Sequence, residues 1–377
     1  MQLQRASEAP ALHVQLTDML KTRIETGVWA EGTLIPTEKL LCDEFNVARG
    51  TIRQALQTLE LEGYVRRQQG KGTFVTWLPN GKNEISTRNA RIAFVVPYVR
   101  DSSVPTVFAA FQQVIESGGG FVSFMQVNND PRQQIQVLER LIAERSAGIA
   151  FYPLDSEANE VFRQVIAADI PLVLIDRYLK TLSTDYVITD HFGGALQGVR
   201  HLLDCGHRAI GYATWYSSAV SMEHRYIGYQ QALRERGLYL NPEWVCTVEG
   251  YPTIDLSPLR ALLSQPNRPT AIFAANDQIA IALYRAALSL NLRVPQDLAV
   301  VGFDNLDVAE QLDPPLTTVA QPFAQIGATA AQILLRRIQG DRSTLEQVTL
   351  SARLVIRNSC PPLTEADKTV WATQVAG

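Results

Sequence analysis

Polar and charged side chains closely follow several short apolar runs of this chain. They are Asp155 after AGIAFYP, Asp176 and Arg177 after PLVLI, Asp190 after YVIT, Asn276 and Asp277 after AIFAA, and Asp304 after VVGF. An isolated residue of this kind is more often a helix cap or a turn residue. Their repetition favours a polar cleft, because carboxylates, amides and an arginine supply the mixed acceptors and donors that a polyhydroxylated ligand needs.

The elements that must position these side chains are strands alternating with helices. The apolar runs that predict strands are IAFVV, FVSFM, AGIAFY, PLVLI, YVIT, AIGYA, TAIFAA and LAVVGF, and amphipathic helical stretches separate most of them. That alternation predicts parallel sheets covered by helices. The strands are too many for one small sheet, so we expect two doubly wound lobes with ligands bound beyond the carboxyl ends of their strands.

A second group of candidate functional side chains is basic and lies near the N-terminus. Residues 49–75 contain five basic and two acidic side chains, although the whole chain carries a net charge of −4. The basic side chains are Arg49, Arg53, Arg66, Arg67 and Lys71. Charge alone would favour a solvated helix face, but a local basic patch can also bind nucleic acid where the average charge cannot.

The elements predicted around these basic residues form a winged helix-turn-helix. Apolar spacing predicts a helix over 12–26, a short helix capped by Thr37, and a third helix that begins at Arg49 and ends before Gly63. Two short strands joined by a glycine-rich turn follow. A major groove admits one helix, and a hairpin beside it reaches the neighbouring backbone, so the order suits DNA recognition.

The segment PTEKLLCDEFNVARGTIRQALQTLELEGYVRRQQGKGTFV resembles the DNA-binding domain of the GntR family of bacterial regulators, over residues 11–76. The resemblance implies operator contacts from Lys39, Arg49, Thr51, Arg53, Gln69, Gly70 and Lys71. Ala48 departs from the family, which usually has Ser or Thr there, so we expect the third helix to begin without a side-chain cap. Gly50 stands where the family commonly has a larger polar residue, so we expect fewer direct side-chain contacts with bases from this position.

The remainder of the chain resembles the effector domain of the LacI/GalR family over residues 91–357. The motifs that carry the resemblance are PLVLIDR, HLLDCGHRAIGY, EHRYIGYQQAL, TAIFAANDQIAIAL, DLAVVGFDN and PPLTTVAQPF. The resemblance implies sugar contacts from Asp155, Arg177, Arg225, Asn276, Asp304, Gln321 and Phe323. It also implies that Asp176 supports Arg177, and that the segment near Val104 to Val107 closes one side of the pocket, although YVRDSSVPTVF departs from the family pattern.

The predicted fold class is therefore α/β, with an N-terminal winged helix-turn-helix before a two-lobed, doubly wound parallel domain. We place the DNA-binding domain at 1–76, a linker at 77–90, the effector domain at 91–360 and a C-terminal tail at 361–377. The linker, WLPNGKNEISTRNA, is polar and replaces the hinge helix found in LacI relatives.

Composition and termini exclude several other classes. Hydrophobic residues make up 46% and charged residues 19% of the 377 residues, which is typical of globular proteins. No apolar run is long enough to cross a bilayer, and the start MQLQRASEAP lacks the apolar stretch of a secretory signal, so we expect a cytoplasmic protein without a membrane partner. The four cysteines are far apart in sequence, and we expect neither a CxxC pair nor a histidine neighbour at ligand spacing, so neither a disulfide framework nor a metal site is predicted.

Enzyme classes receive no support from the motifs. The chain has no G-x-S-x-G, HExxH or Walker sequence, and we interpret its scattered histidines as surface or cap residues: His191, His201, His207 and His224. We expect no catalytic residue and no cofactor. The function predicted is a homodimeric repressor that binds operator DNA and is relieved by a small sugar, a pentose or a hexose. A sugar-activated regulator and a sensor of a non-sugar metabolite stay open as alternatives.

Overall fold

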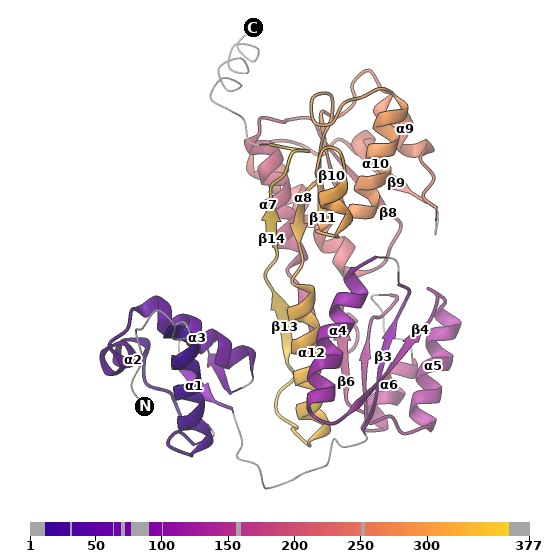
Figure 1. Cartoon of the computed structure of the whole chain (residues 1–377). Helices are drawn as coiled ribbons and strands as arrows, with labels where there is room; N and C mark the ends of the chain where they lie inside the picture. Colours follow the sequence, from indigo (N-terminus) through magenta and orange to yellow (C-terminus); the bar gives the residue numbers. More distant parts are fainter. Residues whose placement is uncertain are drawn as a thin grey trace. The chain divides into compact units, whose positions relative to one another are not determined.

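The chain separates into two compact units, residues 1–84 and 85–377, each described here by itself (Figure 1). The computed structural model describes residues 12–30, 32–62, 64–68, 72–76, 90–99, 101–155, 160–249 and 253–361. Apart from Ala90 and Pro361, the predicted linker and C-terminal tail lie outside these residues. Within the described ranges, no helix is both long and apolar enough to cross a membrane.

The first unit is a three-helix domain with a two-stranded hairpin. Its elements are α1 (Leu12–Glu25), α2 (Glu38–Phe45), α3 (Arg49–Leu61), β1 (Val65–Gln68) and β2 (Gly72–Val75). The hairpin is antiparallel, with Val65 opposite Val75. Leu16, Leu20 and Ile24 recur at helical spacing on α1 and are buried with Ile52 and Leu56 of α3. The predicted winged helix-turn-helix is confirmed.

The ends of α2 and α3 differ as the sequence predicts. The Thr37 hydroxyl accepts a hydrogen bond from the Leu40 amide at 3.4 Å, which caps α2. Ala48 occupies the corresponding position before α3 and makes no side-chain cap. The first turn of α3 therefore has no side-chain partner from its cap residue, and the Thr51 amide donates instead to the Ala48 carbonyl oxygen at 3.0 Å.

The second unit contains two lobes, each built on one six-stranded sheet. Lobe 1 comprises β3 (Arg91–Val96), α4 (Ser103–Ser117), β4 (Phe121–Gln126), α5 (Pro131–Ala143), β5 (Gly148–Phe151), α6 (Glu160–Ala167), β6 (Leu172–Ile175), β7 (Asp185–Thr189), α12 (Phe323–Ile338) and β13 (Gln347–Leu350). Its strand order is β13-β7-β6-β5-β3-β4, and all neighbouring strands are parallel.

Lobe 2 repeats this architecture with one antiparallel edge. It comprises α7 (His191–Asp204), β8 (Ile210–Trp215), α8 (Val220–Glu235), the 3₁₀-helix η1 (Pro242–Trp244), β9 (Val245–Val248), α9 (Ser257–Leu263), β10 (Ala271–Ala274), α10 (Asp277–Ser289), β11 (Ala299–Asp304), α11 (Val308–Gln311), β12 (Thr317–Ala320) and β14 (Arg353–Val355). Its strand order is β14-β12-β11-β10-β8-β9, in which β14 is antiparallel to β12.

The chain crosses between the lobes after β7, after β12 and after β13. Figure 1 shows the last crossing as the yellow path from β13 to β14. Helix α7 consequently packs in the core of lobe 2, and α12 packs in the core of lobe 1. Residues at the first two crossings, 189–191 and 320–323, therefore lie where the two lobes meet.

The predicted fold class is confirmed, and each of the eight apolar runs forms a strand. The runs correspond to β3, β4, β5, β6, β7, β8, β10 and β11, and the central ones are buried along their whole length. Four strands were not predicted: β9, β12, β13 and β14. Three of these unpredicted strands, β9, β13 and β14, lie at sheet edges, where exposed positions break the apolar run.

A glycine allows the closest helix contact in each lobe. A Cβ atom built on Gly327 of α12 would lie 2.0 Å from the Val107 carbonyl oxygen of α4. In lobe 2, a Cβ on Gly228 of α8 would lie 2.6 Å from the Phe192 carbonyl oxygen of α7. Both obstacles are backbone atoms, so a side chain at either position requires the helices to move apart.

We predict that Gly327→Ala lowers the free energy of unfolding by about 1–3 kcal/mol, because the added methyl group overpacks the α4–α12 contact. Gln325→Ala, an exposed change on the same helix, is the control and should alter stability by less than about 0.5 kcal/mol. Guanidinium titration followed by circular dichroism measures both. Equal stabilities of the two variants would show that the contact is not close.

Candidate functional sites

Two arginines stand together at the start of α3. The side chains of Arg49 and Arg53 are 68% and 58% exposed, and both lie beside Glu38 of α2. The Nε atoms of Arg49 and Arg53 donate to Glu38 Oε2 at 2.6 and 3.1 Å. These contacts lower the pKa of Glu38, with the Arg49 hydrogen bond as the largest cause. The carboxylate thus holds two guanidinium groups side by side, while both stay accessible to a phosphate or a base edge.

The structure describes only some of the other residues of the first unit that are predicted to contact DNA. Lys39 on α2 is exposed, and Thr51 on α3 is partly exposed. Gln69, Gly70 and Lys71 lie outside the described residues. These assignments therefore remain predictions.

A hydrogen-bonded chain joins the two lobes through Gln321. The Thr189 hydroxyl, at the end of β7, donates to Gln321 Oε1 at 2.6 Å. The Gln321 Nε2 atom, in the crossing after β12, donates to Asp304 Oδ1 at 2.7 Å. Asp304 ends β11, so this chain connects a strand end of lobe 1 with a strand end of lobe 2.

The charge of Arg225 lies at the centre of this region. The residue is only 3% exposed, and its Nη2 atom lies 3.2 Å from Asp304 Oδ1. Its Nη1 atom donates to the Ala275 carbonyl oxygen at 2.5 Å, and its guanidinium carbon lies 3.8 Å from the centre of the Phe303 ring. A buried charge needs such partners to offset its lost hydration.

His191 extends the network from Arg225 to lobe 1. Its Nδ1 atom accepts from Arg225 Nε at 3.3 Å, and its Nε2–H donates to the Asp176 carbonyl oxygen at 3.2 Å. Burial, and then the Arg225 charge, lower the pKa of His191 to about 3, so the ring is neutral. The Asp176 carboxylate accepts from Arg177 Nε at 3.0 Å. The interpretation of His191 as a surface or cap residue is therefore wrong, because its ring is 1% exposed.

Two aspartates in the network have unusual backbone conformations. Asp176 has a φ of +69° and Asp304 a φ of +115°. Non-glycine residues rarely adopt positive φ, and the conformation costs about 1–3 kcal/mol. Strain of this kind is frequent at functional sites. The two positive φ values therefore support a binding role for these strand ends.

Two carboxyl groups, Asp304 of the network and its neighbour Asp277, have raised pKa values. Asp277 is fully buried and accepts hydrogen bonds from Thr318 Oγ1 at 2.6 Å and from the Leu306 amide at 2.8 Å. Burial, followed by the charge of Asp304, raises the pKa of Asp277 to about 8. Burial also raises the pKa of Asp304, to about 7, against the opposing effect of Arg225. Asp304 keeps Arg225 and Gln321 as partners, so Asp277 retains its proton to the higher pH.

Other predicted residues have structural partners of their own. Asn276 caps α10 by accepting from the Ile279 amide at 3.0 Å, and Asp190 caps α7 by accepting from the Gly193 amide at 2.8 Å. Asp155 accepts from Ser218 of lobe 2 at 3.0 Å. Phe323 is partly buried and packs against the core of lobe 1. The contacts among the described residues thus unite Arg177, Arg225, Asp304 and Gln321, and do not add Asn276 or Phe323.

Two members of the network, Thr189 and His191, were not predicted as site residues from the sequence. Both lie at the first crossing between the lobes, beside the predicted Asp190, and only knowledge of the crossing would have singled them out.

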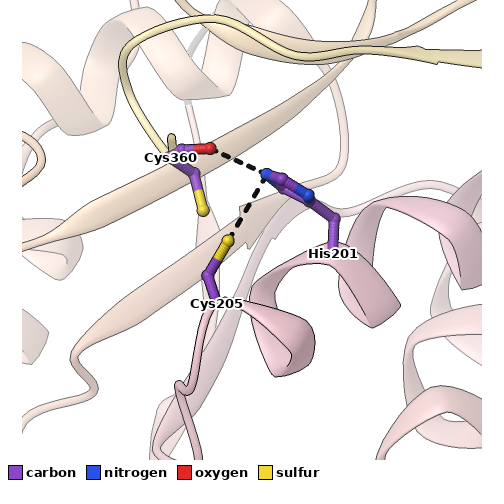
Figure 2. Close-up of side chains that lie close together, drawn as sticks. All are labelled: His201, Cys205 and Cys360. Atoms are coloured by element: carbon purple, nitrogen blue, oxygen red, sulfur yellow. Dashed lines mark hydrogen bonds between the residues drawn. The ribbon is translucent and has the colours of Figure 1, made fainter. Parts of the chain in front are cut away.

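A separate cluster was also missed. His201, Cys205 and Cys360 have their ligand atoms within 4.8 Å of one another (Figure 2). The expectation of cysteines without a nearby histidine is wrong, because His201 and Cys205 are one helical turn apart on α7 and the fold brings Cys360 to them.

Comparisons with known proteins agree with this two-part organisation. Residues 12–75 match the model "Bacterial regulatory proteins, gntR family", and residues 199–360 match "Periplasmic binding protein-like domain". An arabinose metabolism transcriptional repressor of Halalkalibacterium halodurans is 28% identical over 90% of this chain and 94% of its own length. A ribose operon repressor of Haemophilus influenzae is 30% identical over 71% of this chain and 80% of its own length.

Solved structures share the fold of the second unit. A LacI family regulator from Enterococcus faecium with bound ribose has a TM-score of 0.64 and 23% identity, covering 73% of this chain and 100% of that one. Fold and similarity together define a DNA-binding transcription regulator, not an enzyme. The chain belongs to the LacI/GalR family of repressors, within the group in which a GntR-type head precedes the periplasmic-binding-protein-like domain.

The raised pKa of Asp277 makes stability depend on pH. In the unfolded chain an aspartate has a pKa of about 3.9, so between about pH 4 and pH 8 the folded state binds more protons than the unfolded state. The contribution of Asp277 to the free energy of unfolding therefore falls as pH rises through this window. Asp277→Asn removes the titrating group and keeps an acceptor for the Leu306 amide, so we predict a smaller loss of stability between pH 5.5 and 8.5.

Guanidinium titrations at the two pH values test this prediction. Asp169→Asn changes an exposed carboxylate of lobe 1 and is the control, which should follow the wild type. Asp304 titrates as well, so some pH dependence remains in Asp277→Asn. An unchanged pH dependence in that variant would contradict the assignment.

Proposed function

We propose that this regulator is a homodimeric repressor whose operator binding is weakened by a small sugar held between the two lobes. The observation that carries the proposal is the network of Thr189, Gln321, Asp304, Arg225 and His191, which links strand ends of both lobes. A regulator that binds operator DNA acts in the cytoplasm of a bacterium, which agrees with the expected location.

The chemistry of the network supports a polyhydroxylated ligand. Asp304 offers carboxylate oxygens, Gln321 offers both an acceptor and a donor, and Arg225 offers a guanidinium group. A sugar hydroxyl donates to one such group and accepts from another, so a ring with several hydroxyls can replace the direct hydrogen bonds between the lobes. The predicted contacts from Asp155, Arg177, Asn276 and Phe323 would extend this surface.

The names of some of the relatives favour a pentose. Two relatives are repressors named for arabinose metabolism and for the ribose operon, and one structure of this fold contains ribose. We infer a pentose effector on that basis. A thermal-shift screen of common pentoses and hexoses tests the inference, since a ligand that binds only the folded chain raises its melting temperature. Stabilisation by hexoses alone would reject the pentose.

A cavity elsewhere in lobe 1 is a weaker candidate for the effector. Its volume is about 640 Å³, and its lining includes Arg145, Asp169, Arg337 and Arg342. Arg337 already donates to both oxygens of Asp185, at 2.8 and 2.9 Å. A ligand bound there would contact one lobe only, so it would have no direct means of changing how the lobes meet.

Coupling to DNA follows from the crossings between the lobes. A sugar that stabilises one arrangement of the lobes shifts the population of arrangements by its differential affinity for them. In a homodimer whose interface includes both lobes, the shift changes the geometry available to the two heads, which read the halves of a palindromic operator. Repression is then relieved.

We predict that Arg49→Ala weakens operator binding by about 1–3 kcal/mol if its guanidinium contacts a base edge, with unchanged sugar affinity. Arg140→Ala removes an equally exposed arginine from α5 of lobe 1 and is the control. Fluorescence anisotropy with labelled operator measures binding. Wild-type affinity of Arg49→Ala for the operator would contradict the proposed role of α3.

We predict that Asp304→Asn weakens sugar binding at least tenfold, about 1.4 kcal/mol, because an amide cannot accept at both of its terminal atoms. Asparagine tolerates the positive φ of this position, so the fold is retained. Operator binding without sugar should be unchanged. Isothermal titration calorimetry measures the sugar affinity, and Asp341→Asn in lobe 1 is the control. An unaltered sugar affinity of Asp304→Asn would remove Asp304 from the site.

A further inference from the structure

Three side chains with soft or borderline donor atoms converge inside lobe 2, away from the interlobe network. Cys205 terminates α7, His201 lies one turn before it, and Cys360 follows β14 near the end of the described chain (Figure 2). They are 7%, 9% and 1% exposed respectively. Cys205 Sγ lies 3.7 Å from His201 Nε2, and the three donor atoms lie within 4.8 Å of one another.

We propose that His201, Cys205 and Cys360 form a binding site for one thiophilic metal cation of d¹⁰ configuration, Zn(II) or Cu(I). The site is independent of the sugar and DNA sites. It anchors the C-terminal end of α7 to the segment that follows β14.

The donor set suits such a cation by type and by spacing. Thiolates select Zn(II) and Cu(I) over hard cations, and imidazole binds both. Zinc–sulfur bonds of about 2.3 Å and zinc–nitrogen bonds of about 2.0–2.1 Å in tetrahedral geometry put sulfur and nitrogen about 3.5 Å apart. The observed 3.7 Å between Cys205 Sγ and His201 Nε2 is close to that separation.

The donors are held by regular structure on both sides. His201 and Cys205 are four residues apart on α7, so they project from the same face of one helix. On the other side, Ser359 fixes the neighbouring backbone: its Oγ donates to the Val300 carbonyl oxygen at 2.6 Å and accepts from the Thr317 amide at 2.8 Å. A site held in this way loses little conformational entropy on binding a cation.

Metal binding exchanges protons in a defined way. In the structure, His201 Nε2 donates to the Cys360 carbonyl oxygen at 2.7 Å. The cation takes the Nε2 lone pair, so the ring proton moves to Nδ1 and the ring stays neutral. The two thiols release their protons to solvent and bind as thiolates. Cu(I) is satisfied by three donors, whereas Zn(II) takes a water molecule or a backbone carbonyl oxygen as its fourth ligand.

The position of the cluster gives the cation a structural role. Helix α7 begins at His191, in the interlobe network, and ends at Asp204, directly before Cys205, after about 20 Å of helix. A cation at its C-terminal end ties α7 to the segment after β14 that carries Cys360. We therefore expect bound metal to raise the melting temperature of the second unit.

Equilibrium dialysis of the full-length, reduced chain against Zn(II), and separately against Cu(I), tests the proposal, with metal content measured by mass spectrometry. We expect about one equivalent bound per chain for at least one of the two cations. Cys205→Ala and Cys360→Ala should lose this binding and the accompanying rise in melting temperature. Cys246→Ala is the matched control, since Cys246 is a buried cysteine of the same lobe outside the cluster, and it should bind like the wild type.

Several results would overturn the proposal. One is the absence of stoichiometric binding of either cation, and another is equal binding by Cys205→Ala and the wild type. If a variant fails to fold, Co(II) substitution in the wild-type chain decides, because thiolate ligation gives an absorption band that carboxylate or water ligation does not. A Cys205–Cys360 disulfide that forms in air in a chain that takes up no metal when reduced would assign the pair to redox chemistry instead.

Discussion

The body of this regulator depends on how the buried charge of Arg225 is stabilised. The guanidinium group is 3% exposed, so its lost hydration has to be offset by partners within the protein. Asp304 supplies a countercharge, Ala275 a carbonyl oxygen and Phe303 a ring face. His191 completes the set as a neutral acceptor, since its low pKa prevents a second positive charge beside the arginine. His191 also donates to the Asp176 carbonyl oxygen at 3.2 Å, and this hydrogen bond connects the centre to lobe 1.

The topology explains why these groups meet. Parallel strands place their carboxyl ends at one edge of each sheet, and the chain crosses between the lobes at the ends of β7 and β12. Thr189, His191 and Gln321 lie at those crossings, so a change in the angle between the lobes must alter their hydrogen bonds. A ligand that inserts its own hydroxyls among them exchanges internal hydrogen bonds for ligand contacts, which gives binding a direct effect on conformation.

Much of the fold could be predicted from the sequence, because its strongest signals are local. Fully apolar runs marked the central strands, and the Thr37 cap and the missing cap at Ala48 were correctly predicted. Edge strands such as β13 and β14 were missed because their exposed positions break the apolar pattern.

The site was harder to predict because it depends on contacts distant in sequence. Arg225, Asp304 and Gln321 followed from a family resemblance, whereas Thr189 required knowledge of where the chain crosses between lobes. The partnership of Cys360 with His201 spans 159 residues, and no local spacing could reveal it. Predicted contacts such as Asn276 also have an ordinary structural role as a helix cap, which sequence alone cannot separate from ligand binding.

In the proposed mechanism, the sugar and the operator bind different parts of one chain, and each lowers the affinity of the protein for the other. The most direct measurement is the affinity for the proposed effector sugar of the free protein and of its operator complex, by calorimetry under identical salt conditions. Because coupling is reciprocal, a sugar that relieves repression must bind the operator complex more weakly, by about 5–150-fold. Equal affinities in the two states would contradict the account.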